Sequence, residues 1–190
     1  CFGINVNSFC IMTGAQNNNE IRKGFTFFIE ALKILEARLL SKDIPKSLIE
    51  IMVIGEASDE LRNAPFKVIS TGYIDNDGLL AQCYSASDIF VLTSLEDNLP
   101  NAMIESMACE TPLVAFNTGG VCDFVTDFKT GRICSPRESF QLATAMLFAI
   151  QNPQALRKWN KRCRVSIKER CNPLAVTNQY LELFQSRESL

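Results

Sequence analysis

The residues best suited to chemistry lie in one stretch, TSLEDNLPNAMIESMACETPLV, at positions 93–114. Asp97 stands in an expected loop, and Glu105 follows eight residues later inside an expected helix. A helix start has backbone N–H groups without acceptors, which makes it a ready site for a phosphate. The expected donors, excluding the proline that has no N–H group, are Leu99, Asn101 and Ala102. A carboxylate about two turns into that helix, such as Glu105, is well suited to accept hydrogen bonds from vicinal ribose hydroxyls.

Two cations, Arg22 and Lys23, stand at the expected start of an earlier helix. The helix dipole disfavours cations there by about 0.3–1 kcal/mol, and a local rule broken in this way is typical of a functional site. A bound diphosphate would reverse the sign of the effect, which makes Lys23 a candidate phosphate ligand. The alternative is structural: Asp97 caps its helix, Glu105 faces water, and the two cations are solvated side chains.

The composition excludes several kinds of site. The sequence contains no histidine, so a Ser-His-Asp triad, a Cys-His pair and an imidazole metal ligand are not possible. The formal net charge of −2 argues against nucleic acid as a partner, because its phosphates demand a basic face. None of the eight cysteines forms a CxxC pair, so no zinc or redox motif is expected. They are interpreted as small core residues in a reducing cytosol.

The elements that must position the candidate residues alternate between strands and helices. Expected strands cover residues 8–13, 48–54, 66–70, 89–92, 112–116 and 131–134. Expected helices cover residues 22–40, 77–85, 100–109, 138–150, 153–170 and 174–185, with Asp97 or Asn98 as the cap of the third. This alternation predicts an α/β fold, a Rossmann-like doubly wound parallel sheet with helices on both faces. Ligands of such sheets bind at the carboxyl ends of the strands.

The length of 190 residues and the 47% hydrophobic content predict one domain over residues 1–190, with C-terminal helices from about residue 153. No apolar run reaches the ~18 residues that indicate a membrane-spanning helix. No leader for export opens the chain. The expected location is therefore the cytoplasm.

The stretch at 93–114 resembles the signature of retaining GT-B glycosyltransferases of the group 1, or family 4, class. Members have a serine-containing loop, two acidic residues separated by seven others, a small-residue helix and a Pro-Val-Val-Ala-like strand. The residues in step with that signature are Ser94, Asp97, Pro100-Asn101, Glu105-Ser106-Met107-Ala108, Thr111-Pro112-Leu113-Val114-Ala115, Thr118-Gly119-Gly120, Asp123 and Asp127-Phe128-Lys129-Thr130-Gly131. Upstream, Gly72-Tyr73-Ile74 is similar to the base-binding turn and Arg22-Lys23-Gly24 to the Lys-Gly pair of the class. The resemblance covers roughly residues 9–134.

Two positions depart from the pattern of the class. Members usually have Glu at the first acidic position, where this chain has Asp97, and Glu96 stands one residue out of step. Either carboxylate could therefore contact the donor sugar. Members also have an arginine soon after the first strand, whereas Gly14-Ala15 contains none and Arg22 is the nearest.

The resemblance implies the C-terminal, donor-binding half of an enzyme that moves a sugar from a nucleoside-diphosphate sugar to an acceptor hydroxyl with retention. The implied catalytic residues are Lys23 at the diphosphate, Asp97 at the sugar and Glu105 at the ribose. The implied donor-binding residues are Gly14, Arg22, Lys23, Tyr73, Ile74, Glu96, Leu99, Asn101, Ala102 and Glu105. A UDP- or GDP-sugar is the implied donor, no metal is expected, and the pathway is polysaccharide or glycolipid synthesis.

The implied partner is the N-terminal, acceptor-binding half, which this chain lacks and without which it is expected to be inactive. The last helix of the class packs back toward that half, so its apolar residues Leu174, Leu181 and Phe184 are expected to be exposed here. A group of basic residues between 157 and 170 is interpreted either as a solvated helix face or as a contact with an anionic membrane or partner.

Three other functions are weighed against this one. A nucleotide-sugar epimerase would use a similar half-domain and stays open. A non-catalytic nucleotide-binding module also stays open, although the acidic pair of a response regulator is missing after the first strand. A nicotinamide-dependent dehydrogenase is disfavoured, because no GxGxxG turn follows that strand.

Overall fold

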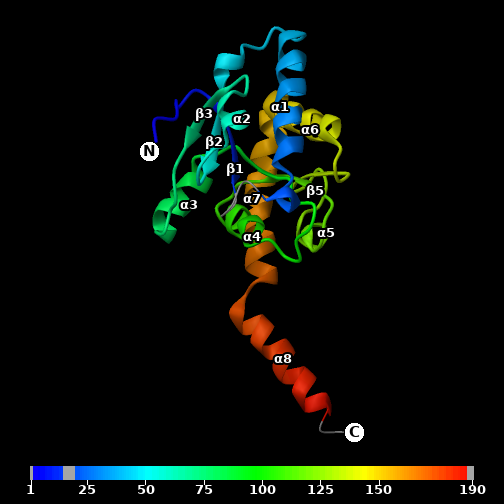
Figure 1. The fold of residues 1–190 in the computed structure, drawn as a ribbon. Helices are drawn as coiled ribbons and strands as arrows, with labels where there is room; N and C mark the ends of the chain where they lie inside the picture. Colours follow the sequence, from blue (N-terminus) through cyan, green and yellow to red (C-terminus); the bar gives the residue numbers. More distant parts are fainter. Residues whose placement is uncertain (1, 15–19, 188–190) are drawn as a thin grey trace.

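The protein is built on a six-stranded sheet, seen here in a computed structural model that describes residues 2–14 and 20–187 (Figure 1). The strand order is β3-β2-β1-β4-β5-β6, and each neighbouring pair is parallel. The strands are β1 (Phe9–Gly14), β2 (Ile49–Ile54), β3 (Lys67–Ser70), β4 (Ile89–Leu92), β5 (Leu113–Phe116) and β6 (Gly131–Cys134). The chain order reverses between β1 and β4, so a ligand site is expected beyond the carboxyl ends of these two strands.

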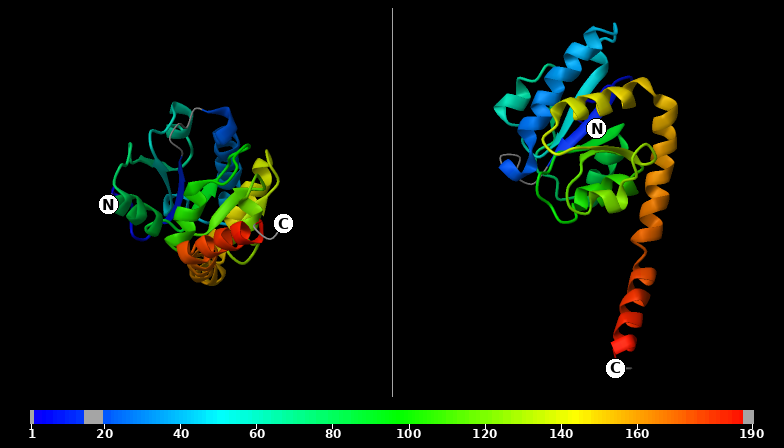
Figure 2. Two further views of the ribbon diagram at one scale, coloured as in Figure 1. Left: turned by 90° about the horizontal axis from the view of Figure 1, so that it is seen from below. Right: turned by 90° about the vertical axis from the view of Figure 1, so that its right-hand side faces the viewer.

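Helices cover both faces of the sheet (Figures 1 and 2). One face packs against α1 (Phe25–Leu40), α2 (Asp59–Arg62) and α6 (Ser139–Gln151). The other packs against α3 (Asp77–Ser85), α4 (Asn101–Ala108) and α5 (Val121–Phe124). The helix α7 (Pro153–Arg170) contributes to both cores, its first half to the first and its second half to the second. Alternate residues of β1 enter the two cores, Ile11 on the first face and Met12 on the second, as the two-residue period of a strand requires. The predicted doubly wound α/β fold is confirmed.

The strands buried on both faces were the most predictable elements. All six predicted strands are present, and the helix at Pro153–Arg170 has its predicted bounds. Two short helices, α2 and α5, were not predicted, nor were the 3-10 turns at Ile21–Lys23 and Lys46–Leu48. The predicted helix at 22–40 begins only at Phe25, because Gly24 is in the left-handed region at φ 66° and separates the 3-10 turn from the helix.

The last helix, α8 (Pro173–Arg187), leaves the body and projects away from it (Figures 1 and 2). Its apolar residues Leu174, Leu181 and Phe184 are each more than half exposed. The basic side chains of α7 are also exposed, and both interpretations of them stay open. Among the described residues, no helix has the length and apolar character needed to cross a membrane.

The cysteines within the described residues are unpaired. Cys10, Cys83, Cys134 and Cys163 are buried, as predicted for small core residues, and burial raises the pKa of the Cys10 thiol to about 11. Cys122, within α5, is exposed, so the interpretation of the cysteines as core residues is wrong at that position.

Candidate functional site

A cavity of about 690 Å³ opens at the carboxyl ends of β1, β2 and β4, at the reversal of the strand order. Because the resemblance implies a sugar donor, this cavity is called the donor cleft. The predicted site residues that line it are Gly14, Arg22, Lys23, Tyr73, Ile74, Asp97, Leu99, Asn101, Ala102 and Glu105. Glu96 is exposed and does not line the cleft, so of the two candidate carboxylates Asp97 is the one that faces it. Residues 15–19, which follow β1 in the sequence, lie outside the described residues.

The 3-10 turn at Ile21–Lys23 is fixed to the loop that follows β4. The Thr93 hydroxyl donates a hydrogen bond to the Lys23 carbonyl at 2.8 Å, and the Leu95 N–H donates to the Arg22 carbonyl at 2.7 Å. These bonds join the segments that leave β1 and β4, so both sides of the cleft floor are held together. The prediction that Arg22 and Lys23 stand at the start of the helix is therefore wrong, because both lie in a 3-10 turn ahead of it.

Lys23 is paired with Asp97 across the cleft floor. The Lys23 Nζ lies 3.0 Å from the Asp97 Oδ2, and both side chains are 19% exposed. Arg22 pairs in turn with Glu20 at 2.6 Å. Since an ammonium can donate three hydrogen bonds, Lys23 can hold an added anion while it keeps Asp97. Lys23, which is predicted to contact the diphosphate, thus lies next to Asp97, which is predicted to contact the sugar.

The start of α4 faces the same cleft, although its cap differs from the prediction. The N-cap residue is Pro100, and no side chain accepts a hydrogen bond there, so the prediction of Asp97 or Asn98 as the cap is wrong. Asp97 is instead committed to Lys23. The N–H groups of Asn101 and Ala102 belong to the first turn and lack intrahelical acceptors, as the start of any α-helix requires. An anion at this end of the cleft would meet these donors.

The loop that holds Asp97 is braced by the turn at 118–120. The Gly120 N–H donates to the Asn98 carbonyl at 2.7 Å, and the Thr118 hydroxyl donates to the Ser94 carbonyl at 2.9 Å. Gly119 has φ 51°, and a Cβ there would overlap the Asp97 carbonyl. The Gly-Gly pair noted in the sequence therefore serves a close backbone approach that fixes Asp97 in place.

Glu105 has a partner that the sequence analysis did not assign. The Tyr84 hydroxyl donates a hydrogen bond to the Glu105 Oε2 at 3.0 Å, from α3 to α4. Burial, and secondarily the charge of Glu105, raise the pKa of the Tyr84 phenol, so it remains a donor at neutral pH. Glu105 itself is exposed to the cleft. Nothing local in the sequence indicates the contact between Tyr84 and Glu105.

The base-binding turn predicted at Gly72-Tyr73-Ile74 closes one side of the cleft. The Gly55 N–H donates to the Gly72 carbonyl at 3.0 Å, which ties this turn to the end of β2. Tyr73 is 82% exposed, whereas Ile74 packs against the second core. An apolar surface at Ile74 beside an exposed aromatic ring suits a planar base.

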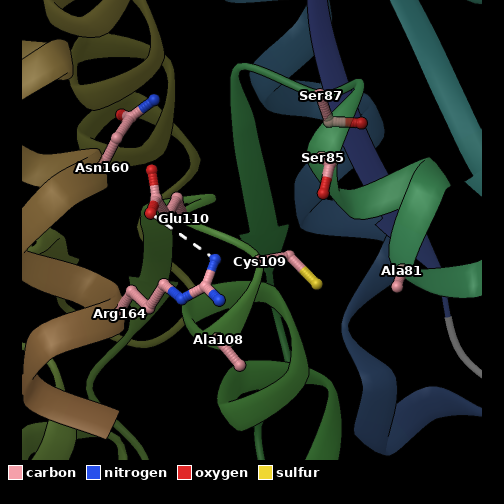
Figure 3. Close-up of a pocket in the computed structure, with 8 residues that line it drawn as sticks. All are labelled: Ala81, Ser85, Ser87, Ala108, Cys109, Glu110, Asn160 and Arg164. Carbon is pink, nitrogen blue, oxygen red and sulfur yellow. Dashed lines mark ion pairs between the residues drawn. The ribbon is translucent and has the colours of Figure 1, made fainter. Parts of the chain in front are cut away.

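A second cavity, of about 550 Å³, lies between α3, the end of α4 and α7, and contains none of the predicted site residues (Figure 3). Glu110 and Arg164 pair across it at 3.7 Å, while the thiol of Cys109 points away from that pair. Asn160 has a buried side-chain oxygen without a hydrogen-bond partner in the described residues. Within the described ranges, no cluster of three or more acidic or cysteine side chains could hold a metal ion.

Comparison with known sequences places the chain in a family. The sequence model described as "Glycosyl transferases group 1" matches residues 9–152. An uncharacterized glycosyltransferase of Haemophilus influenzae is 26% identical over 147 residues, which cover 75% of this chain and 40% of that protein. A glycogen synthase of Mycobacterium tuberculosis is 33% identical over 93 residues, covering 49% of this chain and 22% of that enzyme. The chain thus spans less than half the length of these relatives.

Solved structures have the same fold. Sucrose-phosphate synthase from Thermosynechococcus elongatus superposes with a TM-score of 0.77 at 23% identity, over 98% of this chain and 47% of that one. Anabaena HepE in complex with UDP superposes with a TM-score of 0.77 at 20% identity, over 95% of this chain and 49% of that one. The family match covers all six strands of the sheet and every described residue that lines the cleft. The chain therefore belongs to the group 1 glycosyl transferases.

Proposed function

We propose that the chain is the donor-binding half of a retaining glycosyltransferase, which holds a UDP- or GDP-sugar in the donor cleft. The observation that supports this most is the convergence of Lys23, Asp97 and Glu105 on one cavity at the reversal of the strand order. The fold matches Anabaena HepE, whose structures contain UDP and UDP-glucose. A group 1 glycosyl transferase needs such a donor, and this cleft has a cation, free helix N–H groups and two carboxylates.

The diphosphate lies between Lys23 and the start of α4. Negative charge grows on the diphosphate as the bond to the sugar breaks, and donors already aimed at that position stabilise the transition state more than the ground state. Asp97, held by Lys23, orients the sugar hydroxyls next to the diphosphate. Glu105 accepts hydrogen bonds from the ribose, and Ile74 packs against the base.

Replacing Glu105 with glutamine tests the proposed site. We expect about a tenfold loss of UDP affinity, since a hydrogen bond to a charged group contributes about 1.5–3 kcal/mol and the amide is a weaker acceptor. Isothermal titration calorimetry of the chain with UDP, GDP and ADP measures the three affinities and also shows which nucleotide base the chain prefers. Glu182→Gln, on the projecting helix α8, is the matched control and should bind as the unaltered chain does. No binding of any nucleoside diphosphate to the unaltered chain would exclude the proposal.

The whole enzyme contains, in this proposal, a preceding acceptor-binding half against which α8 packs. The exposed Leu174, Leu181 and Phe184 form an apolar face that lacks a cover in the described residues. In a protein that joins both halves, α8 amides should exchange hydrogen more slowly than in this chain. Equal exchange rates would contradict the docking of α8.

Proton NMR of the product of that protein should show the donor's anomeric configuration retained, and an inverted centre would exclude retention.

A further inference from the structure

Tyr84 is fixed by contacts of both its ring and its backbone. It is 3% exposed, and its ring packs edge-on against Phe90 with centroids 5.5 Å apart. Its carbonyl accepts a hydrogen bond from the Thr111 hydroxyl at 2.7 Å. Both the ring and the backbone of Tyr84 are therefore fixed from β4 and from the segment that follows α4. Tyr84 is part of the second core, but it also lines the donor cleft, where its hydroxyl contacts Glu105.

Glu105 differs from Tyr84 in this respect. It lies on the exposed side of α4, where a glutamate side chain is free to change rotamer at little cost. Fixing such a side chain costs conformational entropy. The hydrogen bond from Tyr84 meets that cost before any ligand arrives. The Glu105 Oε1 has no hydrogen-bond partner among the described residues, and Glu105 lines the donor cleft.

We propose that Tyr84 is a positioning residue, which fixes the Glu105 carboxylate so that its second oxygen meets the ribose hydroxyls of the donor. This inference rests on the proposed function, because it takes the ligand of the cleft to be a ribonucleotide. A carboxylate accepts up to about four hydrogen bonds, so one from Tyr84 leaves enough capacity for a vicinal diol. An acceptor oriented in advance gains affinity, since less freedom is lost on binding.

The proposal predicts a change in discrimination between ribose and deoxyribose. The unaltered chain should bind UDP about tenfold more tightly than 2′-deoxy-UDP, because the missing hydroxyl leaves Glu105 with one partner fewer. In Tyr84→Phe, UDP affinity should fall about fivefold while 2′-deoxy-UDP affinity changes less than twofold. The preference for UDP should thus shrink to about twofold. Tyr180→Phe, on α8, is the matched control and should keep the full preference.

Calorimetry with both nucleotides separates this role from a structural one. If Tyr84→Phe only disturbs the core, both affinities fall together and the ratio stays at its original value, which overturns the proposal. Should Tyr84→Phe fail to fold, Tyr84→Met removes the same hydroxyl, fills the buried space with a flexible apolar side chain and leaves Glu105 intact, and it should give the same reduced ratio. An unchanged ratio in that variant also overturns the proposal. Failure of the unaltered chain to bind UDP would instead exclude the proposed function itself.

Discussion

Replacing Lys23 with methionine is expected to weaken UDP binding about a hundredfold. Methionine keeps the length of the side chain but removes the charge that would face the diphosphate. A hydrogen bond to a charged group contributes about 1.5–3 kcal/mol. The change also leaves the Asp97 carboxylate, 3.0 Å away, without its cation and close to the ligand's negative charge. The two effects act in the same direction, and about 2.7 kcal/mol corresponds to a hundredfold change in affinity.

A second substitution separates these two effects. In the double variant Lys23→Met with Asp97→Asn the repulsion is absent, so part of the lost affinity should return. Lys46→Met is the matched control. Lys46 lies just before β2, at the end of that strand opposite the cleft, and it also forms an ion pair, with Glu36. Calorimetry at two salt concentrations measures all three variants, since attraction between charges falls as salt rises. UDP affinity in Lys23→Met equal to that of the unaltered chain would show that the diphosphate lies elsewhere.

Replacing Gly24 with alanine is expected to lower the free energy of unfolding by about 3–5 kcal/mol, the range of the most damaging single substitutions. Gly24 has φ 66°, which costs a residue with a Cβ about 1–2 kcal/mol. A Cβ there would also overlap the Thr93 carbonyl. To avoid this overlap, the 3-10 turn would have to separate from the loop after β4, which would break the hydrogen bonds to the Arg22 and Lys23 carbonyls. Urea unfolding measures the change.

Gly3→Ala separates backbone strain from the close approach. Gly3 has a similar φ of 73°, but a Cβ at that position meets no atom within 4 Å. Its alanine variant should therefore lose only about 1–2 kcal/mol, the cost of the left-handed conformation. Equal losses in the two variants would mean that contact between Gly24 and Thr93 contributes nothing to stability.

The sheet could be predicted because each strand's own residues specify it. Segments such as Ile49–Ile54 are apolar except for Glu50 and are followed by glycine, which is typical of a strand covered by helices on both sides. The candidate residues of the cleft could be named for a related reason. The carboxyl ends of parallel strands meet at one edge, so loops far apart in sequence are brought together.

The conformations of the loops themselves could not be predicted, because distant contacts determine them. The turn at Ile21–Lys23 depends on hydrogen bonds to Thr93 and Leu95, about seventy residues away. Asp97 is an ideal cap by type, yet it pairs with Lys23, and Pro100 takes the N-cap position. The contact between Tyr84 and Glu105 joins two helices whose faces are set only when both have packed on β4.

The first strand of the chain lies in the middle of the sheet, and this bears on how the protein is made. Met12 has Met52 as its neighbour on one side and Phe90 on the other. During synthesis, one edge of β1 must therefore remain unpaired until residues 89–92 have left the ribosome. Such an edge readily pairs with other chains, and pairings so distant in sequence form slowly. The edge of β1 that later pairs with β4 is thus a part of the nascent chain that needs protection from aggregation.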